Sequence, residues 1–166
     1  MLNRQGCCIY KGVAVTMRLF GSPDPCNPAS ATQLELRSWS VERIVELSGY
    51  RTDIAAQYAV ANIVCFPSYY GEGFPKTLVE GAACGRAVVA TDHPGCRDAI
   101  ELVVTGGLVP VKSAPSLADA IQMLIETPEL RLRMGKAGRE LAEQAYSIDR
   151  IFEQHLAIYK ELLGDG

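Results

Sequence analysis

The sequence lacks several features that would assign it at once to a functional class. No apolar run is long enough to span a bilayer, and no clear secretory signal opens the chain. Basic residues are not in excess, because 16 Lys and Arg stand against 19 Asp and Glu, giving a net charge of -3. A nucleic-acid-binding protein, which needs a basic surface, is therefore not expected.

The six cysteines also lack the pattern of a metal site. They stand at positions 7, 8, 26, 65, 84 and 96, and no two of them have the C-x-x-C spacing of zinc ligands. Cys65 lies in a strand-like apolar run and Cys84 in a helix-like segment, where cysteine acts as a small apolar side chain. We expect reduced cysteines, no bound zinc and a cytoplasmic protein.

What is present is an alternation of strand-like and helix-like segments. Strands are predicted at 13–20, 44–47, 63–66, 87–90 and 106–111. Helices are predicted at 31–40, from a cap at 52 or 53 to 61, 75–85, 97–101, 117–126, 128–145 and 148–163. This order predicts an α/β fold, a Rossmann-like parallel sheet with helices on both faces, and one domain covering residues 1–166.

Three details of these helices can be checked in a structure. The first helix has Ser30 or Thr32 as its candidate N-cap. The 128–145 helix contains Gly135 and Gly138, at either of which it is open to a break. The last helix places apolar side chains along one face, namely Ile148, Phe152, Leu156, Tyr159, Leu162 and Leu163, with His155 among them.

Residues 63–98 form the stretch around which the chain is organised. A short apolar strand is followed by a loop with Gly71 and Gly73, a helix that begins near Pro75, and a second strand. Such a unit binds anions at its loop and at the free N–H groups of the helix N-terminus. Glu72 and Glu80 frame that loop, roughly 10 Å apart if each helical residue adds 1.5 Å.

The segment from Glu72 to Glu80 reads EGFPKTLVE, with Pro67-Ser68 before it and ACGR and Thr91-Asp92 after it. It resembles the E-x7-E signature of the retaining glycosyltransferases of family four (glycosyl transferases group 1), which have the two-domain GT-B architecture. The resemblance implies that this chain is the C-terminal, donor-binding domain of such an enzyme. It implies a nucleotide-diphosphate sugar as the donor substrate.

The resemblance also implies roles for individual residues. Glu72 would be catalytic, contacting the donor sugar or steadying charge at the anomeric centre, and Glu80 would accept hydrogen bonds from the ribose hydroxyls. Each could instead be an ordinary exposed carboxylate. The nucleotide sugar would be bound by the start of the helix, at Gly73, Phe74, Lys76 and Thr77. Pro75, which has no N–H to offer, stands where the family usually has glycine.

Further candidates lie elsewhere in the chain. Gly21 and Ser22 match a glycine loop that approaches the donor phosphates, or form a surface turn. Tyr50 and Arg51 follow a strand whose loop lies beside the nucleotide base in the family, or form an exposed turn. Ser68 and His93 are weaker candidates at strand ends, where ligands gather in open α/β sheets. His155 is expected to be a packing residue.

Metal and cofactor are not expected. No Asp-x-Asp pair is present, which argues against the metal-dependent glycosyltransferase architecture. The charge of the leaving diphosphate would be stabilised by helix N-termini and cationic side chains. The Lys76-Thr77 pair superficially resembles the end of a phosphate loop, but Pro75 replaces the required glycine and the loop has the wrong length.

The resemblance has consequences for partners. The N-terminal acceptor domain, and the Arg and Lys that grip the donor diphosphate, have no counterpart before Val13, so we expect the chain alone to bind without efficient transfer. The loop at 94–98 (PGCRD) resembles that of bacterial enzymes which often use UDP-sugars and act on saccharide or lipid-linked acceptors. Peripheral membrane association of the full-length enzyme, and self-association of this chain through its C-terminal helix, would be compatible with that role.

Two other functions stay open at this point. The chain could be half of a nucleotide-sugar epimerase or phosphorylase of the same architecture, although the catalytic residues that these need are not found. It could also be a non-catalytic nucleotide-binding α/β domain. A receiver-like domain would need acidic residues clustered at strand ends, and Asp24, Asp53 and Asp92 are not predicted to gather in that way.

Overall fold

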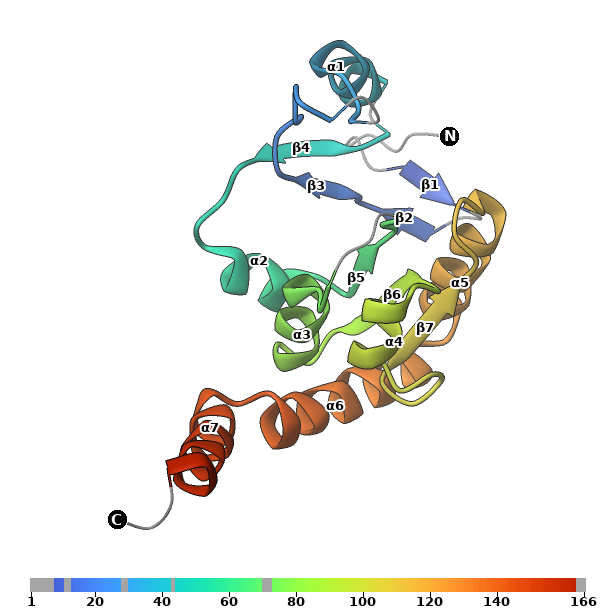
Figure 1. Ribbon diagram of the computed structural model, residues 1–166. Coiled ribbons are helices and arrows are strands. Elements are labelled where there is room, and N and C mark those ends of the chain that lie inside the picture. Colours follow the sequence, from blue (N-terminus) through green and yellow to red (C-terminus); the bar gives the residue numbers. More distant parts are fainter. Residues whose placement is uncertain (1–7, 11–12, 28–29, 43, 70–72, 164–166) are drawn as a thin grey trace. The chain divides into compact units, whose positions relative to one another are not determined.

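The computed structural model describes residues 8–10, 13–27, 30–42, 44–69 and 73–163 (Figure 1). The chain divides into two compact units, Met1–Asp53 and Ile54–Gly166. Each has its own parallel strand pairing; among the described residues the first unit has one helix and the second has the others. The prediction of a single domain over the whole chain stays a prediction.

The first unit contains four strands and one helix among its described residues. Strand β1 (Cys8–Tyr10) pairs antiparallel with β2 (Val13–Val15), and β3 (Arg18–Phe20) pairs parallel with β4 (Glu46–Gly49). The prediction of one strand over 13–20 was therefore wrong. The segment changes partner after Val15: β2 bonds to β1, whereas β3 bonds to β4, with the Glu46 N–H donating to the carbonyl of Met17.

Helix α1 (Gln33–Val41) begins where Thr32, one of the two candidate caps, provides a capping box. The Glu35 N–H donates to Thr32 Oγ1 at 3.2 Å, and the Thr32 N–H donates to Glu35 Oε2 at 2.8 Å. The following strand begins two residues later than predicted. Ile44 is still part of the helix end, because its N–H donates to the carbonyl of Trp39.

The second unit is built on a parallel sheet in the order β5-β6-β7. Its strands are β5 (Ile63–Phe66), β6 (Ala87–Thr91) and β7 (Gly106–Val109), paired in parallel register. Helix α2 (Ile54–Val60) precedes β5, α3 (Lys76–Ala83) connects β5 to β6, and α4 (Pro94–Ala99) lies between β6 and β7. The predicted strand–loop–helix–strand unit at 63–98 is confirmed.

Strand β6 is buried on both sides because helices cover both faces of this sheet. Val88 and Ala90 point to one face and pack with residues of α3 and α4. Ala87 and Val89 point to the other face and pack with Leu124 of α5 (Ala114–Glu126) and Met134 of α6 (Pro128–Ala145). The predicted fold class, a parallel α/β sheet with helices on both faces, is confirmed.

Helix α6 is continuous through both glycines, so the break predicted as an option at Gly135 or Gly138 does not occur. These glycines instead permit a close approach to α3 and to the turn that follows it. A Cβ on Gly135 would lie 2.2 Å from the carbonyl oxygen of Gly85, and one on Gly138 would lie 3.3 Å from Ala82 Cβ. Gly85 itself ends α3 in the left-handed region, at φ +70°, as predicted.

Other boundaries also differ from the sequence prediction, most of all the starts of two helices. Helix α4 spans Pro94–Ala99 rather than 97–101, because Pro94 occupies its first position and is well suited to a helix start. Helix α5 begins at Ala114 rather than 117, with Ser113 as its N-cap: the Ser113 hydroxyl accepts from the Ser116 N–H. Both differences lengthen the helices toward their N-termini.

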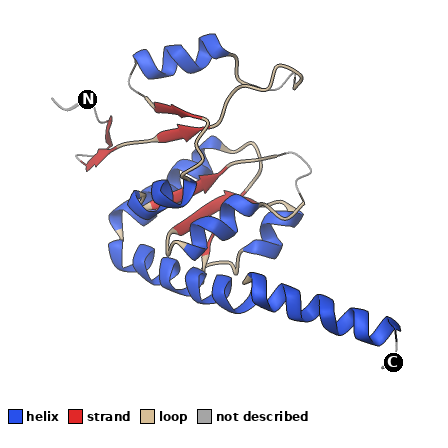
Figure 2. Ribbon diagram, turned by 90° about the vertical axis from the view of Figure 1, so that its left-hand side faces the viewer, coloured by secondary structure: helices blue, strands red, loops and turns tan. Residues whose placement is uncertain are grey.

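Helix α7 (Ile148–Leu163) follows α6 at the C-terminal end of the described chain (Figure 2). None of its residues is buried. Its predicted apolar stripe is confirmed as an exposed one, with Phe152 at 62% and Leu162 at 75% exposure. His155 is exposed too, so its predicted role as a packing residue is not seen in this unit.

Candidate functional site

The N-terminal end of α3 is the centre of the candidate site. Pro75 is its N-cap in an extended conformation and makes no side-chain cap, so the first N–H groups of the helix receive no side-chain oxygen there. Gly73 is exposed, and a Cβ added to it would meet no atom within 4 Å. Lys76, the first helical residue, is exposed. Glu72, the predicted catalytic residue, lies outside the described residues.

Phe74, beside this helix end, is held by the C-terminal end of α6. Its ring lies 5.0 Å from that of Tyr146, at an interplanar angle of 60°. The Tyr146 hydroxyl donates to the carbonyl of Asp98 in α4 at 2.9 Å. Burial of the phenol raises the pKa of Tyr146, and the nearby carboxylates of Glu101 and Asp98 add to that effect. A loop residue predicted to face the donor is thus anchored by elements far along the chain.

The carboxyl ends of the three strands are connected to one another. The Thr91 hydroxyl at the end of β6 donates to the carbonyl of Ser68, which follows β5. The Asp92 N–H donates to the carbonyl of Val109 in β7 at 2.7 Å. After β7, the Lys112 ammonium lies 4.9 Å from the centre of the Tyr69 ring, a cation–π contact. These contacts join the three loops on which ligands bind in open α/β sheets.

Asp92 and Arg97 form an exposed ion pair at this same edge, with 2.6 Å between Arg97 Nε and Asp92 Oδ1. The hydrogen bond from Arg97 holds the pKa of Asp92 below its usual range. Next to it, His93 places its Nδ1 atom out of contact with solvent and without a hydrogen-bond partner in the described structure. His93 therefore stands at a strand end, as predicted, and its role stays a prediction.

Glu80 lies in the second turn of α3 and is exposed. Thr77, one turn earlier on the same face, shares a side-chain hydrogen bond with Tyr58 of α2. Burial raises the pKa of Tyr58, and the negative charge of Glu80 adds to that effect. Tyr58 was not among the candidates, because an aromatic residue in a short helix gives no signal of such a contact.

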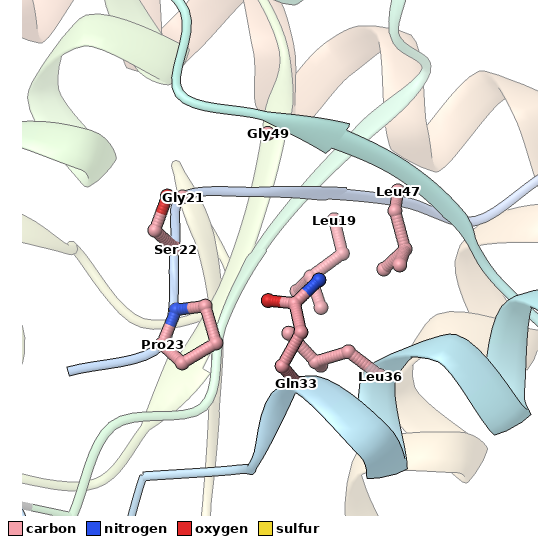
Figure 3. Close-up of a pocket in the computed structure, with 8 residues that line it drawn as sticks. All are labelled: Leu19, Gly21, Ser22, Pro23, Gln33, Leu36, Leu47 and Gly49. Carbon is pink, nitrogen blue, oxygen red and sulfur yellow. The ribbon is translucent and has the colours of Figure 1, made fainter. Parts of the chain in front are cut away.

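The first unit holds a small pocket of about 120 Å³ beyond the carboxyl ends of β3 and β4 (Figure 3). Gly21 and Ser22, both predicted site residues, line it together with Gly49 and Gln33. Gly21 has φ +113° and its N–H donates to the Gly49 carbonyl at 2.9 Å, a conformation that suits glycine. Figure 3 shows the Gln33 amide among apolar side chains of α1 and both strands.

Tyr50 and Arg51 follow β4 at the end of the first unit. Tyr50 is 81% exposed, so its ring is free to stack on a planar ligand or to remain in solvent. Arg51 is paired with Asp53, with 2.6 Å between its Nη2 and the Asp53 Oδ2. That pair raises the pKa of the Arg51 guanidinium and occupies part of its hydrogen-bonding capacity. The binding roles of these four residues of the first unit stay predictions.

Two further properties concern metals and membranes. Among the residues that the structure describes, no three His, Cys, Asp or Glu side chains gather closely enough to hold a metal ion. No helix in the described ranges is both long and apolar enough to cross a bilayer.

Comparisons with known proteins identify the family. Residues 27–141 match glycosyl transferases group 1. The chain is 34% identical, over 137 residues, to the N,N'-diacetylbacillosaminyl-diphospho-undecaprenol alpha-1,3-N-acetylgalactosaminyltransferase of Campylobacter jejuni, a match that covers 82% of this chain and 35% of that protein. The chain thus spans about a third of the length of this relative.

Solved structures give the same result. The fold matches HepE from Anabaena in complex with UDP at a TM-score of 0.81 and 25% identity, covering 89% of this chain and 41% of that one. It also matches the C-terminal domain of a glycosyl transferase group 1 protein, LpcC, from Francisella tularensis, at a TM-score of 0.61 and 27% identity, with 70% and 60% covered. The family suggested by the E-x7-E segment is therefore confirmed: this chain belongs to the glycosyl transferases group 1 family.

Proposed function

We propose that this chain is the donor-binding domain of a glycosyltransferase and binds a nucleotide-diphosphate sugar, with a UDP-sugar favoured. The observation that carries the proposal is the uncapped start of α3, with Lys76 as its first residue and Glu80 one turn further. A helix N-terminus attracts phosphate through its free N–H groups and its dipole. The likeness to HepE, whose structure was solved with UDP, supports the choice of base.

The proposed roles follow from this placement. Glu80 accepts hydrogen bonds from both ribose hydroxyls, since one carboxylate has enough lone pairs for two donors. The phosphates lie at the backbone of Gly73, Phe74, Lys76 and Thr77, and Glu72 contacts the donor sugar near the reacting centre. Gly21 and Ser22 approach the phosphates, and Tyr50 and Arg51 lie beside the base.

We propose transfer with retention of anomeric configuration and without a metal ion. The negative charge of the leaving diphosphate is stabilised by the N-terminus of α3 and by cationic side chains. The acceptor is a saccharide or a lipid-linked saccharide; support comes from the Campylobacter relative, whose name specifies a diphospho-undecaprenol acceptor. Such an acceptor places the full-length enzyme in the cytoplasm, peripherally associated with the inner face of the membrane, where it acts in polysaccharide or glycan biosynthesis.

The whole protein, on this proposal, includes an acceptor-binding domain, because the chain spans about a third of the relative that it matches. The exposed apolar face of α7 is covered by that domain. The chain alone then self-associates through the same face, since Phe152, Tyr159 and Leu162 are all more than half exposed. Sedimentation velocity tests this: Phe152→Ser with Leu162→Ser should shift a concentration-dependent dimer to monomer. A parent chain that stays monomeric at high concentration argues against self-association.

Isothermal titration calorimetry tests donor binding directly. The chain is titrated with UDP, GDP and their glucose and N-acetylhexosamine derivatives, once with EDTA and once with Mg²⁺. We expect UDP to bind equally in both and to bind at least tenfold more weakly to Glu80→Ala, since a charge-assisted hydrogen bond contributes about 1.5–3 kcal/mol. Glu140→Ala is the matched control, because Glu140 is an exposed glutamate of α6.

The possible outcomes separate the parts of the proposal. Binding that Glu80→Ala leaves unchanged would contradict the ribose assignment, and binding only with Mg²⁺ would contradict metal independence. No binding of any nucleotide, in the chain and in the whole protein alike, would refute the donor-domain function. Retention is read separately, from the anomeric configuration of the product of the whole enzyme by proton NMR.

A further inference from the structure

The backbone that leads into α3 is held by a residue at the C-terminal end of α6. Phe74 directly precedes Pro75, the N-cap of α3. Its ring lies 5.0 Å from the ring of Tyr146, at an interplanar angle of 60°. A tilted aromatic pair of this kind contributes free energy beyond the area that it buries. The contact therefore joins the start of α3 to the end of α6.

Tyr146 is itself fixed at two points. It is the C-cap of α6, and its backbone N–H donates to the carbonyl of Ala142 at 3.0 Å. Its hydroxyl donates to the carbonyl of Asp98 in α4 at 2.9 Å. Burial and the carboxylates of Glu101 and Asp98 raise the pKa of this phenol, so it stays protonated at neutral pH and keeps its donor. The ring that meets Phe74 is thus restrained at its backbone and at its hydroxyl.

The backbone beside Phe74 is open to solvent and contains glycine. Gly73 is exposed, and a Cβ added to it would meet no atom within 4 Å. Because glycine samples more backbone conformations than other residues, ordering it on binding carries an entropic cost. Pro75 makes no side-chain cap and has no N–H of its own. A ligand at the start of α3 meets mainly backbone groups, and their direction depends on how firmly Phe74 is held.

We propose that Tyr146 is a positioning residue for donor binding: its ring holds Phe74 and thereby orients the backbone that receives the diphosphate. The inference rests on the proposed function, because the diphosphate is part of the proposed donor. It gives the C-terminal end of α6 a part in donor affinity that the segment from Glu72 to Glu80 does not contain. Tyr146 touches no substrate in this assignment; it acts through Phe74.

The first experiment tests this anchor without any ligand. Amide ¹⁵N relaxation gives the order parameter of the Phe74 N–H in the parent chain, in Tyr146→Leu, in Tyr146→Phe and in the control Tyr159→Leu, which lies on the exposed helix α7. We expect a rigid value of about 0.85 in the parent, in Tyr146→Phe and in the control, and a value below about 0.6 in Tyr146→Leu. A mobile Phe74 N–H in the parent, or an equal value in Tyr146→Leu, would overturn the proposal.

The second experiment measures the affinity for UDP by isothermal titration calorimetry. We expect Tyr146→Leu to weaken UDP binding about 3- to 10-fold, the range that one aromatic pair contributes. Tyr146→Phe should stay within about twofold of the parent, because the ring remains. Phe74→Leu changes an exposed side chain and tests the same contact from the other side, so it should cause a similar loss. The two leucine substitutions together should cause no greater loss than either alone, because both break one contact.

Leu130→Ala is the matched control for a general loss of stability. It removes packing at the other end of α6, against the core cluster that contains Leu124 and Met134, and leaves the start of α3 unaltered. We expect it to lower the free energy of unfolding and to leave UDP affinity unchanged. The same loss of UDP affinity in Leu130→Ala as in Tyr146→Leu would show a merely structural role and refute the inference.

The other outcomes also decide the matter. Unchanged UDP affinity in Tyr146→Leu and Phe74→Leu would refute the positioning role, as would losses that add in the double variant. If the parent chain binds no UDP, the proposed function fails and the inference fails with it. The order parameters then still show whether Tyr146 holds Phe74, so the two failures are distinguishable.

Discussion

Replacing Gly135 by alanine tests the packing that places α3 in this fold. Gly135 lies in the middle of α6, where an exposed glycine would be a defect that alanine repairs. Its Cβ, however, would lie 2.2 Å from the Gly85 carbonyl oxygen and 2.9 Å from the Gly85 carbonyl carbon. Both atoms belong to the backbone of the turn between α3 and β6, so no flexible side chain can move aside.

The size of the effect follows from two opposing contributions. Alanine in place of glycine stabilises a helix by about 1 kcal/mol. To reach ordinary contact at 3.4 Å, the Cβ must withdraw by about 1 Å, which displaces α6 from α3 and disturbs the packing of the adjacent Met134, which is 2% exposed. Overpacking of this kind costs about 1–3 kcal/mol and occasionally more. Because the obstructing atoms are backbone, we take the upper end of this range, about 3 kcal/mol, and expect a net destabilisation of about 2 kcal/mol, opposite in sign to the effect at an exposed helical site.

Urea denaturation followed by circular dichroism measures this difference. Gly138→Ala is the matched control: it has the same helix and the same gain in propensity, but its Cβ would lie 3.3 Å from Ala82 Cβ and 3.6 Å from the Thr105 carbonyl oxygen. Its effect should be markedly smaller. If Gly135→Ala leaves stability unchanged or raises it, the close approach of α6 to the α3–β6 turn is not what the structure indicates, and the explanation of the unbroken helix fails.

Three other changes have defined outcomes. Val103 has φ +67°, so Val103→Gly should stabilise the chain by about 1 kcal/mol in thermal denaturation; no gain would show that the strain is absent. Thr32→Ala should cost about 1 kcal/mol by loss of the N-cap. The hydrogen bonds from Thr32 lower the pKa of Glu35. The contribution of this carboxylate to the free energy of unfolding is therefore present above its unfolded pKa and is lost as the pH falls through the lowered, folded value. If the parent chain and Thr32→Ala show the same pH dependence of stability, this reasoning is wrong. Cys65 is exposed as a residue, yet desolvation raises the pKa of its thiol to about 11. At pH 8 only about one Cys65 thiol in a thousand is therefore ionised. Its alkylation by iodoacetamide, followed by mass spectrometry, should be far slower than that of free cysteine in solution, whose thiol pKa is about 8.5.

Much of the second unit could be predicted from local sequence signals. The strand at 63–66 was predicted with its exact bounds, because a short apolar run ends at Pro67-Ser68. The start of α3 followed from Pro75, and its end from Gly85, which adopts the left-handed conformation that few other residues tolerate. The family followed from the spacing of Glu72 and Glu80 with their flanking strands, and the match over residues 27–141 confirms it.

Partner choice among strands could not be predicted in the same way. The 13–20 segment has a continuous strand-like pattern, yet it is divided between two pairings, with β1 and with β4. Alternation of apolar residues indicates that a strand forms; it does not indicate which neighbour accepts its hydrogen bonds. The glycines of α6 were ambiguous for a similar reason. A glycine in a helix-like segment can mark a break, because its helix propensity is low, or a position where another part of the chain packs closely against the helix.

The sequence by itself determined the order of strands and helices in the second unit and the family to which the chain belongs. These depend on neighbours within a few residues, or on a spacing that one segment contains. Only the tertiary structure decided that Phe74 rests on Tyr146 and that Gly135 packs against the carbonyl of Gly85. Such contacts join residues about 50 to 70 positions apart, and they are set by the packing of helices on the sheet rather than by any local pattern.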